Sequence, residues 1–336
     1  MAVPGIIKLT IIIPTFNRAS SLEKTLSSVT SAPIPPDLEV EVIVVDNNST
    51  DNTRAIVERM RPEFHVIKLD YEFEPRQGRS YAVNTGIRKA SGDLISMIDD
   101  DEQIDTSWFA ELRNIFKSRW EELDFASGKI LPILESEPPP WIGPIKHGPL
   151  VWRDFGDEEW KFDRNTPIVL GAHGIFKKSV FDKTGLYSES LGVKGKGMLG
   201  GEDEVFYDQL MENNFRGLYH PKLIVHHNLP ARRMTESYYR NWLIGVGRSR
   251  RIADVNYKKI DGPRIFGVPR WMFRSAGQGI LKRAKYTFRR NKEEALVAEN
   301  QPLVLLGFLY ETFLSGRPIG RLLKRSAQLF TREIER

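Results

Sequence analysis

Short β-branched apolar runs alternate with helix-forming segments over the first hundred residues, and this alternation limits the fold more than any other feature. We expect strands at Leu9–Ile13, Val40–Val45, His65–Leu69 and Leu94–Ile98, with helices near residues 20–30, 52–60 and 80–90. Strands that alternate with helices favour a mainly parallel sheet covered by helices on both faces. The sequence therefore predicts an α/β fold.

Three of these strands end in clusters of polar residues. Pro14, Thr15 and Asn17 follow the first strand. Asp46 begins the segment after the second strand, and three aspartates, residues 99–101, follow the fourth. In sheets of this kind, ligands bind beyond the carboxyl ends of the strands. We therefore expect the clusters to meet in one site at one edge of the sheet.

The run Asp99, Asp100 and Asp101 is the sharpest of these signals, because adjacent carboxylates repel one another and need a compensating cation. Carboxylate oxygens are hard ligands and the chain has no Cys, so the metal we expect is Mg²⁺ or Mn²⁺. A metal held in this way neutralises a diphosphate in phosphate-handling enzymes. The alternative is a solvated acidic turn that caps a helix starting near Asp105.

The chain lacks the glycine fingerprints of common nucleotide sites. The first strand is not followed by Gly-x-Gly-x-x-Gly, the motif of dinucleotide-binding sites. The chain also contains no Gly-x-x-x-x-Gly-Lys-Ser/Thr, the phosphate-binding loop motif. A nucleotide must therefore be held differently. Asp46 can accept a hydrogen bond from a pyrimidine N–H or a ribose hydroxyl, and Pro14 and Thr15 can present backbone groups beside the base. Each of these residues could equally form a turn.

Five short motifs, taken together, carry a resemblance to a known family. They are Ile-Ile-Pro-Thr-Phe-Asn (12–17), Val-Val-Asp-Asn-Asn-Ser-Thr-Asp (44–51), Gln-Gly-Arg-Ser-Tyr-Ala-Val-Asn-Thr-Gly (77–86), Ile-Asp-Asp-Asp (98–101) and Gly-Gly-Glu-Asp-Glu (200–204). In this order, residues 8–230 resemble an inverting family 2 glycosyltransferase of the GT-A fold. The resemblance implies a Rossmann-like nucleotide-binding half. It also implies transfer of a sugar from a nucleotide diphosphate donor to a hydroxyl of a glycan or lipid-linked acceptor.

The resemblance further implies roles for individual residues. Asp46 contacts the nucleotide base, and its carboxylate favours the ring N–H that uracil and thymine share, hence a UDP-sugar. Asp99 and Asp101 form the Asp-x-Asp motif at the metal, with Asp101 as the better metal ligand and Asp99 nearer the ribose or the metal-bound waters. Asp100 lies between them in the donor site. Asp203 is the general base, with Glu202 beside it.

The chemistry asks for such residues independently. An inverting transfer needs a carboxylate that takes the proton of the acceptor hydroxyl, on the face opposite the leaving diphosphate. Glu202 and Asp203 begin an expected helix at residues 202–213, whose dipole favours ionised carboxylates. Gly200 and Gly201 before it let the backbone approach the sugar. The alternative is an ordinary acidic first turn.

Further polar residues are assigned by the same resemblance. His226 and His227 follow a strand-like segment, and one of them is expected to reach the metal or diphosphate. Neighbouring strand residues point to opposite faces, and we favour His226. Val83 stands where family members often carry Arg, so diphosphate neutralisation falls to Arg79 or Arg76.

An irregular segment, residues 132–166, is expected to contact the acceptor. It is rich in Pro and Trp, and long loops inside a compact domain are usually functional. Trp141 and Trp152 are candidate stacking platforms for a sugar, and His173, which stands where Asn is frequent in the family, joins them as a candidate. The alternative is that the tryptophans anchor the loop to the core.

The charge of the chain is divided unevenly about residue 231. Residues 1–231 hold 26 basic and 35 acidic side chains, a net charge of −9, and residues 232–336 hold 23 basic and 9 acidic ones, a net charge of +14. Basic helices with apolar faces favour binding to an anionic membrane surface. No nucleic-acid module is evident, and the apolar stretch Pro302–Leu309 is too short to span a bilayer. The alternative is a helical tail packed on the catalytic domain.

The sequence therefore predicts a catalytic domain over residues 1–231, with a nucleotide-sugar half (1–104) and an acceptor half (105–231), and a basic helical extension over 232–336. With no Cys and no secretion signal evident, we expect a cytoplasmic protein, peripheral at the inner face of the membrane. The competing functions are a sugar-phosphate nucleotidyltransferase and a membrane-surface scaffold with a degenerate site.

Overall fold

The structure is a computed structural model, and it describes residues 5–145, 148–168, 170–195 and 197–315. The chain divides into two compact units. The first unit comprises Met1–Pro138, Lys146–Lys196 and Glu202–Arg233, and the second comprises Pro139–Ile145, Gly197–Gly201 and Met234–Arg336. Two short segments from the region expected to be catalytic, 139–145 and 197–201, thus belong to the second unit.

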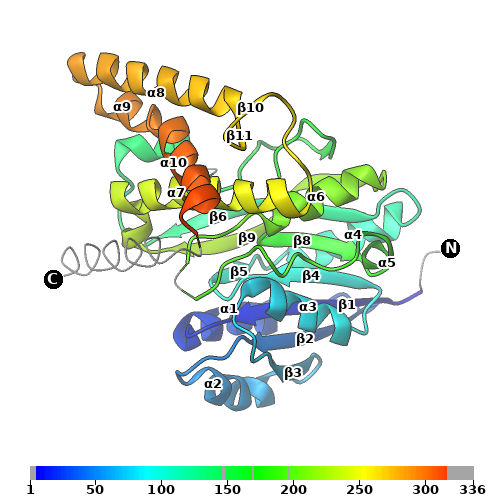
Figure 1. Cartoon of the computed structure of the whole chain (residues 1–336). Coiled ribbons are helices and arrows are strands. Elements are labelled where there is room, and N and C mark those ends of the chain that lie inside the picture. Colours follow the sequence, from blue (N-terminus) through cyan, green and yellow to red (C-terminus); the bar gives the residue numbers. More distant parts are fainter. Residues whose placement is uncertain (1–4, 146–147, 169, 196, 316–336) are drawn as a thin grey trace. The chain divides into compact units, whose positions relative to one another are not determined.

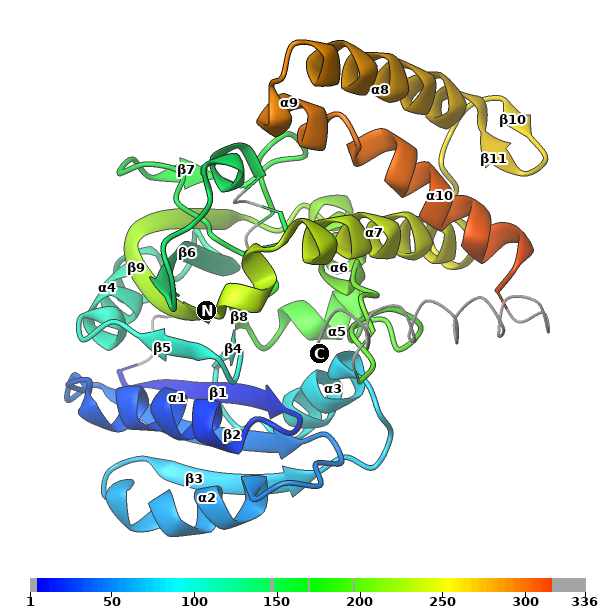
Figure 2. The same ribbon diagram turned by 90° about the vertical axis from the view of Figure 1, so that its left-hand side faces the viewer.

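The first unit is built on one curled sheet (Figures 1 and 2). Its strands are β1 (Ile7–Thr15), β2 (Leu38–Asp46), β3 (Lys68–Phe73), β4 (Leu94–Ile98), β5 (Glu102–Ile104), β6 (Phe125–Leu134), β7 (Trp160–Lys161), β8 (His173–Lys177) and β9 (Gly217–Leu229). They lie in the order β3-β2-β1-β4-β8-β6-β9-β5, and β7 pairs with β9. The first four strands pair in parallel, whereas β8 runs antiparallel to both β4 and β6. The predicted mainly parallel α/β fold is confirmed.

Helices connect and cover these strands. They are α1 (Ala19–Ser31), α2 (Thr53–Met60), α3 (Arg79–Lys89), α4 (Trp108–Arg119), α5 (Val180–Thr184) and α6 (Glu202–Glu212), with a 3₁₀ turn η1 (Arg61–Glu63). Because crossover connections are right-handed, α1 and α2 lie on one face of the parallel strands and α3 on the other. Ile11, Val44 and Ile95 are completely buried between these layers. The third strand begins at Lys68, three residues later than the expected start at His65.

The second unit is helical. It contains η2 (Pro140–Ile145), α7 (Glu236–Asn256), α8 (Arg270–Phe288), α9 (Lys292–Val297), α10 (Asn300–Phe313) and a short hairpin of β10 (Arg264–Ile265) and β11 (Val268–Pro269), and the turn η3 (Ala231–Met234) leads into it. Tyr239, Leu243 and Phe308 are buried at its core. Helices α7 and α10 cross closely, since a β-carbon on Gly247 would lie 2.0 Å from the carbonyl oxygen of Val304.

No helix among residues 5–145, 148–168, 170–195 and 197–315 is both long enough and apolar enough to cross a membrane.

Candidate functional site

The three aspartates after β4 contact two arginines and a threonine. Arg79 Nη2 donates to Asp99 Oδ1 at 2.8 Å. Asp100 accepts from Thr15 Oγ1 and from Arg18 Nη1, each at 2.8 Å. The same Arg18 nitrogen lies 2.6 Å from Asp101 Oδ2. A cation therefore neutralises each carboxylate of the triplet within the chain itself.

The pKa values of Asp100 and Asp101 shift in opposite directions. Burial raises the pKa of Asp100 to about 6, although the charge of Arg18 opposes the shift. Burial also acts on Asp101, but a hydrogen bond with His227 and the nearby charges of Arg18 and Arg233 outweigh it. They hold the pKa of Asp101 well below its usual range. Asp101 is thus the member of this pair that is fully ionised at neutral pH.

Two further carboxylates begin helix α6, and Arg79 links them to the triplet. Arg79 Nη1 lies 3.5 Å from Glu202 Oε1 and 3.9 Å from Asp203 Oδ1. Glu202 Oε2 and Asp203 Oδ1 have no hydrogen-bond partner in the described part of the chain. Desolvation raises the pKa of Asp203, and it raises the pKa of Glu202 to about 8 with the help of the Asp203 charge. Both shifts exceed the opposing effect of Arg79.

The backbone of Gly171 lies directly against the side chain of Asp203. A β-carbon on Gly171 would lie 2.0 Å from Asp203 Oδ2, closer than any real contact. The carbonyl of Gly171 also accepts a hydrogen bond from Arg79. A side chain at this position would therefore displace the carboxylate of Asp203.

The ends of β1 and β2 lie next to the triplet. Thr15 pairs with Asp46, and Pro14 with Val45, in the parallel register of these strands. Asp46 is buried and accepts from Ser49 N at 2.8 Å and from the Tyr71 hydroxyl at 2.7 Å. A carboxylate has about four lone-pair positions, so Asp46 retains capacity for a ligand.

Asn17 holds two of the loops together. Its backbone N–H donates to Ser49 Oγ at 2.9 Å, and its side-chain oxygen accepts from Thr50 N at 2.7 Å. Its φ of 52° lies in the left-handed region, which Asn adopts more readily than most residues. The structure thus brings the three predicted strand-end clusters to one edge of the sheet.

His227, rather than His226, faces the aspartates. His227 is buried, with Nε2 3.5 Å from Asp101 Oδ2 and 3.0 Å from Arg233 Nη1. His226 points to the opposite face of β9, where its Nε2 lies 3.4 Å from Asp105. The expectation that His226 lies in the site is therefore corrected. The pairing of β5 with β9 sets which of the two neighbours turns inward, and the sequence does not reveal that register.

His173 does not reach an acceptor site. Its side chain is completely buried at the start of β8, where Nε2 accepts a hydrogen bond from Trp108 Nε1 at 2.8 Å. Burial lowers the pKa of His173 to about 3, so the ring is neutral. The candidate acceptor role of His173 is corrected to a role in the core.

The two candidate tryptophans lie in different units. Trp141 belongs to η2 in the second unit, where its ring centroid lies 6.2 Å from that of Tyr239. Trp152 is half-buried in the first unit. Their contact with an acceptor stays a prediction.

Several residues of the site were not assigned from the sequence. Arg18 directly follows the first strand-end motif, and Tyr71 lies within β3. Glu102 is buried next to the triplet and accepts from Asp99 N at 3.0 Å. Arg18 and Tyr71 are recognised only by partners that lie far away in the sequence, whereas Glu102 bonds a residue three positions before it.

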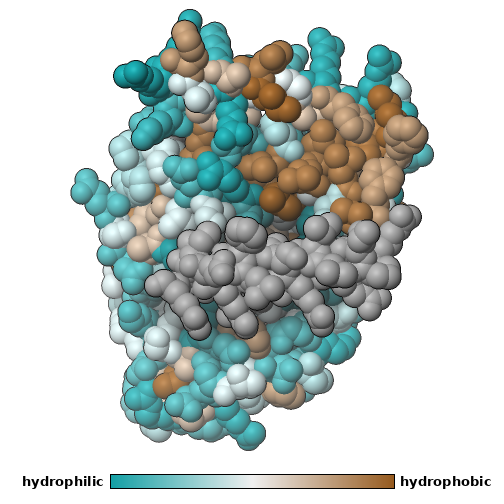
Figure 3. Space-filling model, turned by 60° about the vertical axis from the view of Figure 1, so that its left-hand side comes forward, coloured by the Kyte–Doolittle hydropathy of each residue, from teal (hydrophilic) through white to brown (hydrophobic). Residues whose placement is uncertain are grey.

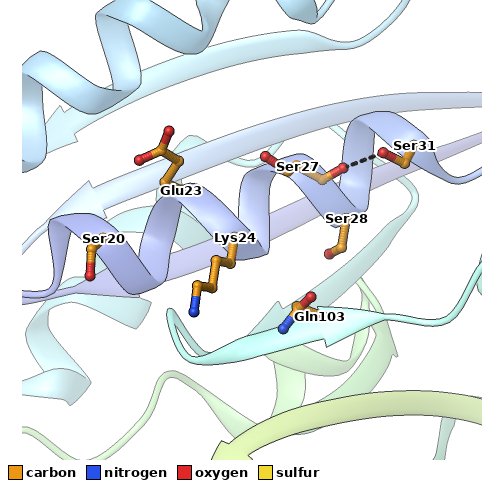
Figure 4. A pocket seen from close by; sticks show the side chains of 7 residues that line it. All are labelled: Ser20, Glu23, Lys24, Ser27, Ser28, Ser31 and Gln103. Carbon is orange, nitrogen blue, oxygen red and sulfur yellow. Dashed lines mark hydrogen bonds between the residues drawn. The ribbon is translucent and has the colours of Figure 1, made fainter. Parts of the chain in front are cut away.

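A shallow pocket of about 550 Å³ lies elsewhere on the first unit, along α1 (Figure 4). Its lining consists of Ser20, Glu23, Lys24, Ser27, Ser28, Ser31 and Gln103. None of the carboxylates described above lines it, so the carboxylate site and this pocket are separate features.

Comparison with known proteins identifies the family. The model of glycosyl transferase family 2 matches residues 10–185, which is more than half of the chain. The chain belongs to glycosyl transferase family 2. The resemblance seen in the five sequence motifs is thereby confirmed.

Curated relatives in this family are similar over part of their length. A GalNAc(5)-diNAcBac-PP-undecaprenol β-1,3-glucosyltransferase of Campylobacter jejuni is 34% identical over 29% of this chain and 30% of its own length. The glycosyltransferase MG060 of Mycoplasma genitalium is 31% identical over 55% of this chain and 60% of its own length. A glucosyl-dolichyl phosphate glucuronosyltransferase of Haloferax volcanii is 28% identical over 74% of this chain and 78% of its own length. The chain thus spans less than two thirds of the first two relatives.

Solved structures share the fold. The mannosyltransferase PcManGT of Pyrobaculum calidifontis, in complex with GDP-Man and Mn²⁺, has a TM-score of 0.53 and 20% identity, over 96% of this chain and 80% of its own. S. aureus TarS 1–349, in complex with UDP-GlcNAc, has a TM-score of 0.54 and 16% identity, over 88% and 91%. The GT-A fold of this family 2 chain is confirmed.

A divalent metal requires several donor atoms close together. In the described ranges, no group of three or more His, Asp or Glu residues lies close enough to hold a metal alone. Asp101 Oδ2 and His227 Nε2 do face one another at 3.5 Å. Mg²⁺ is often held by one or two carboxylates plus substrate phosphates, and Mn²⁺ accepts such oxygen ligands and imidazole. Both atoms are also contacted by arginines, since Arg18 Nη1 lies 2.6 Å from Asp101 Oδ2 and Arg233 Nη1 lies 3.0 Å from His227 Nε2. A metal at this pair would have to displace these contacts and take its remaining ligands from a donor diphosphate.

Proposed function

We propose that this family 2 chain is a metal-dependent, inverting glycosyltransferase, which moves a sugar from a nucleotide diphosphate donor to a hydroxyl of a glycan or lipid-linked acceptor. One observation carries the proposal. Arg79 lies between Asp99 on one side and Glu202 and Asp203 on the other. The carboxylate proposed to bind the donor and the carboxylates proposed to include the general base therefore lie around the same arginine. A displacement at the anomeric carbon requires donor and base to be close together in this way.

Asp203 is the general base in this proposal. It stands in the first turn of α6, and one of its oxygens has no hydrogen-bond partner in the part of the chain that the structure describes. Its raised pKa makes it a better proton acceptor than an ordinary surface carboxylate. Glu202, whose pKa is about 8, is protonated beside it at neutral pH and adds no second negative charge.

The donor lies along the ends of β1, β2 and β4. Asp46 accepts from the base or ribose, Pro14 and Thr15 contact the nucleotide, and Asn17 holds the loop that flanks it. The ring N–H of uracil suits Asp46, which favours a UDP-sugar. Related folds are known with UDP-GlcNAc and with GDP-Man, so a nucleotide-sugar of either kind fits the fold.

Asp101 and His227 would hold Mn²⁺ or Mg²⁺. His227 thus takes the metal-binding role that was expected of His226. When bound, the metal neutralises the charge that develops on the leaving diphosphate. Asp99 and Asp100 then orient the donor through the arginines that they bind. Arg79 and Arg18 contribute positive charge to the same diphosphate site.

The second unit offers a surface for an anionic membrane. Arg274, Leu281, Lys285 and Phe288 recur at helical spacing along α8, and all four are exposed. Phe266, at the tip of the β10–β11 hairpin, is 85% exposed. Apolar side chains gather over the C-terminal helices in Figure 3. Apolar and basic side chains on one helix face suit the interface of an anionic bilayer, so we propose peripheral attachment at the inner face of the cytoplasmic membrane.

Product analysis tests the proposed reaction. The purified chain is incubated with Mn²⁺, a set of nucleotide-sugars and membrane lipid extract as the source of acceptor. Release of free nucleoside diphosphate together with glycosylated lipid supports sugar transfer. Release of pyrophosphate instead would identify a nucleotidyltransferase. Binding to anionic vesicles with no turnover of any donor would identify a scaffold.

A further inference from the structure

Arg18 joins the last two aspartates of the triplet through a single nitrogen. Its Nη1 lies 2.8 Å from Asp100 Oδ1 and 2.6 Å from Asp101 Oδ2. The side chain of Arg18, which comes from the turn between β1 and α1, is 35% exposed. The side chains of Asp100 and Asp101 are only 6% and 10% exposed. The arginine therefore reaches solvent, whereas the two carboxylates that it joins lie in the interior.

Asp101 Oδ2 is the oxygen that a metal would share with His227. His227 Nε2 lies 3.5 Å from this oxygen, and Arg233 Nη2 lies 3.3 Å from it. Arg18 makes the shortest of the three contacts. A carboxylate has about four lone-pair positions, or roughly two for each oxygen. A metal and Arg18 therefore compete for the same atom.

The two aspartates depend on Arg18 to different degrees. Asp100 contacts Arg18 and accepts a hydrogen bond from Thr15 Oγ1 at 2.8 Å. Asp101 keeps the two further contacts just described when Arg18 leaves it. A buried carboxylate that loses its cation is destabilised, because neither water nor a counter-charge replaces it. Arg18 therefore gives up Asp101 more readily than Asp100.

We propose that Arg18 is a positioning residue that couples metal binding to donor binding. Arg18 releases Asp101 to the metal, stays with Asp100 and donates its other N–H groups to the donor diphosphate. The planar guanidinium, with five N–H donors, suits the paired oxygens of a phosphate. This inference rests on the proposed function, in which metal and diphosphate meet at Asp101. When no diphosphate is present, Arg18 gains no new anion in exchange for Asp101, so the metal alone should bind weakly.

Measurements of Mn²⁺ binding test this inference without any sugar transfer. Electron paramagnetic resonance follows free Mn²⁺, with and without saturating UDP, in the wild type and in Arg18→Gln. Mn²⁺ alone should bind roughly tenfold more tightly to Arg18→Gln, because its competitor for Asp101 is gone; couplings between two sites are commonly about 5- to 150-fold. UDP should raise the Mn²⁺ affinity of the wild type by a larger factor than that of the variant.

Two further variants complete the test. Arg18→Lys should lie between the wild type and Arg18→Gln, since lysine keeps the charge but lacks the planar fork, and it replaces Arg18→Gln if that variant does not fold. Arg59→Gln is the matched control, because Arg59 pairs with Glu23 at 2.8 Å instead. It should bind Mn²⁺ as the wild type does, with and without UDP.

Unchanged or weaker binding of Mn²⁺ alone by a folded Arg18→Gln variant would overturn the inference, because Arg18 would then be a fixed part of the site. So would the failure of Mn²⁺ to bind any of these proteins even with UDP, because Arg18 would then hold Asp101 permanently. If the chain showed the predicted coupling but transferred no sugar from any donor, the proposed function would fail while the inference stood.

Discussion

The backbone of Gly171 lies against the carboxylate of Asp203, so that a β-carbon at Gly171 would stand 2.0 Å from Asp203 Oδ2. Gly171→Ala should therefore displace the candidate base without changing its chemistry. We expect transfer to fall by about 10²-fold, since a shift of about 1 Å is enough for such a loss. Donor binding, measured by calorimetry with UDP and Mn²⁺, should persist. Gly277→Ala, which adds a methyl group where nothing lies within 4 Å, is the control. Full activity of Gly171→Ala would show that Asp203 can move without cost.

Asp203→Asn should remove the proton acceptor while keeping the shape of the side chain. We expect the rate of transfer to fall by about 10²–10⁴-fold, with donor affinity unchanged. Steady-state kinetics and nucleotide binding give the two readouts. Glu204→Gln, at the exposed next position of α6, should leave both unchanged. Transfer at the wild-type rate by Asp203→Asn would assign the base elsewhere.

The two neighbouring histidines provide a matched test of the metal proposal. His227→Ala should weaken Mn²⁺ binding in the presence of UDP by roughly tenfold or more, because the imidazole beside Asp101 is lost. His226→Ala should not, since His226 faces Asp105. Electron paramagnetic resonance of free Mn²⁺ measures both. Chelation by EDTA should abolish donor binding, and added Mn²⁺ should restore it. Activity that persists in EDTA would rule out the metal requirement.

The raised pKa of Glu202 predicts how stability depends on pH. The folded chain keeps a proton on Glu202 up to about pH 8, whereas the unfolded chain releases it above about 4.5. The folded state therefore binds more protons between these values, and its stability falls as the pH rises through them. In Glu202→Gln this contribution is absent, so the variant should gain in Tm relative to the wild type from pH 5 to pH 8. Parallel Tm curves for the two proteins would contradict the assignment.

The exposed face of α8 and the hairpin tip predict membrane binding. Replacing Phe266, Leu281 and Phe288 together by Ser should reduce sedimentation with phosphatidylglycerol vesicles, because their apolar contacts are lost. Arg274→Gln with Lys285→Gln should weaken binding by about tenfold or more at low salt, at about 1 kcal/mol for each charge. Val66→Ser, at an exposed apolar residue of the first unit, is the control. Equal binding to neutral phosphatidylcholine vesicles would exclude an electrostatic role.

The sequence by itself determined the parts of this protein that depend on local pattern. β-branched runs followed by polar residues mark β1, β2 and β4, because strands favour such side chains and chains turn at Asp and Asn. Five motifs in one order marked the family, and the family model confirms it. These signals lie within short stretches of chain, so no distant partner is needed to recognise them.

Only the tertiary structure decided which of these residues meet. Arg18 reaches Asp100 and Asp101 across more than eighty residues, and Arg79 spans both acidic groups. The alternation of side chains along a strand predicts that His226 and His227 point to opposite faces. The register of β5 against β9 determines which of the two faces Asp101. Histidine is a residue type common in binding sites, yet His173 lies in β8 with its side chain buried in the core. Pairing register and burial arise from the whole chain at once, and no local pattern contains them.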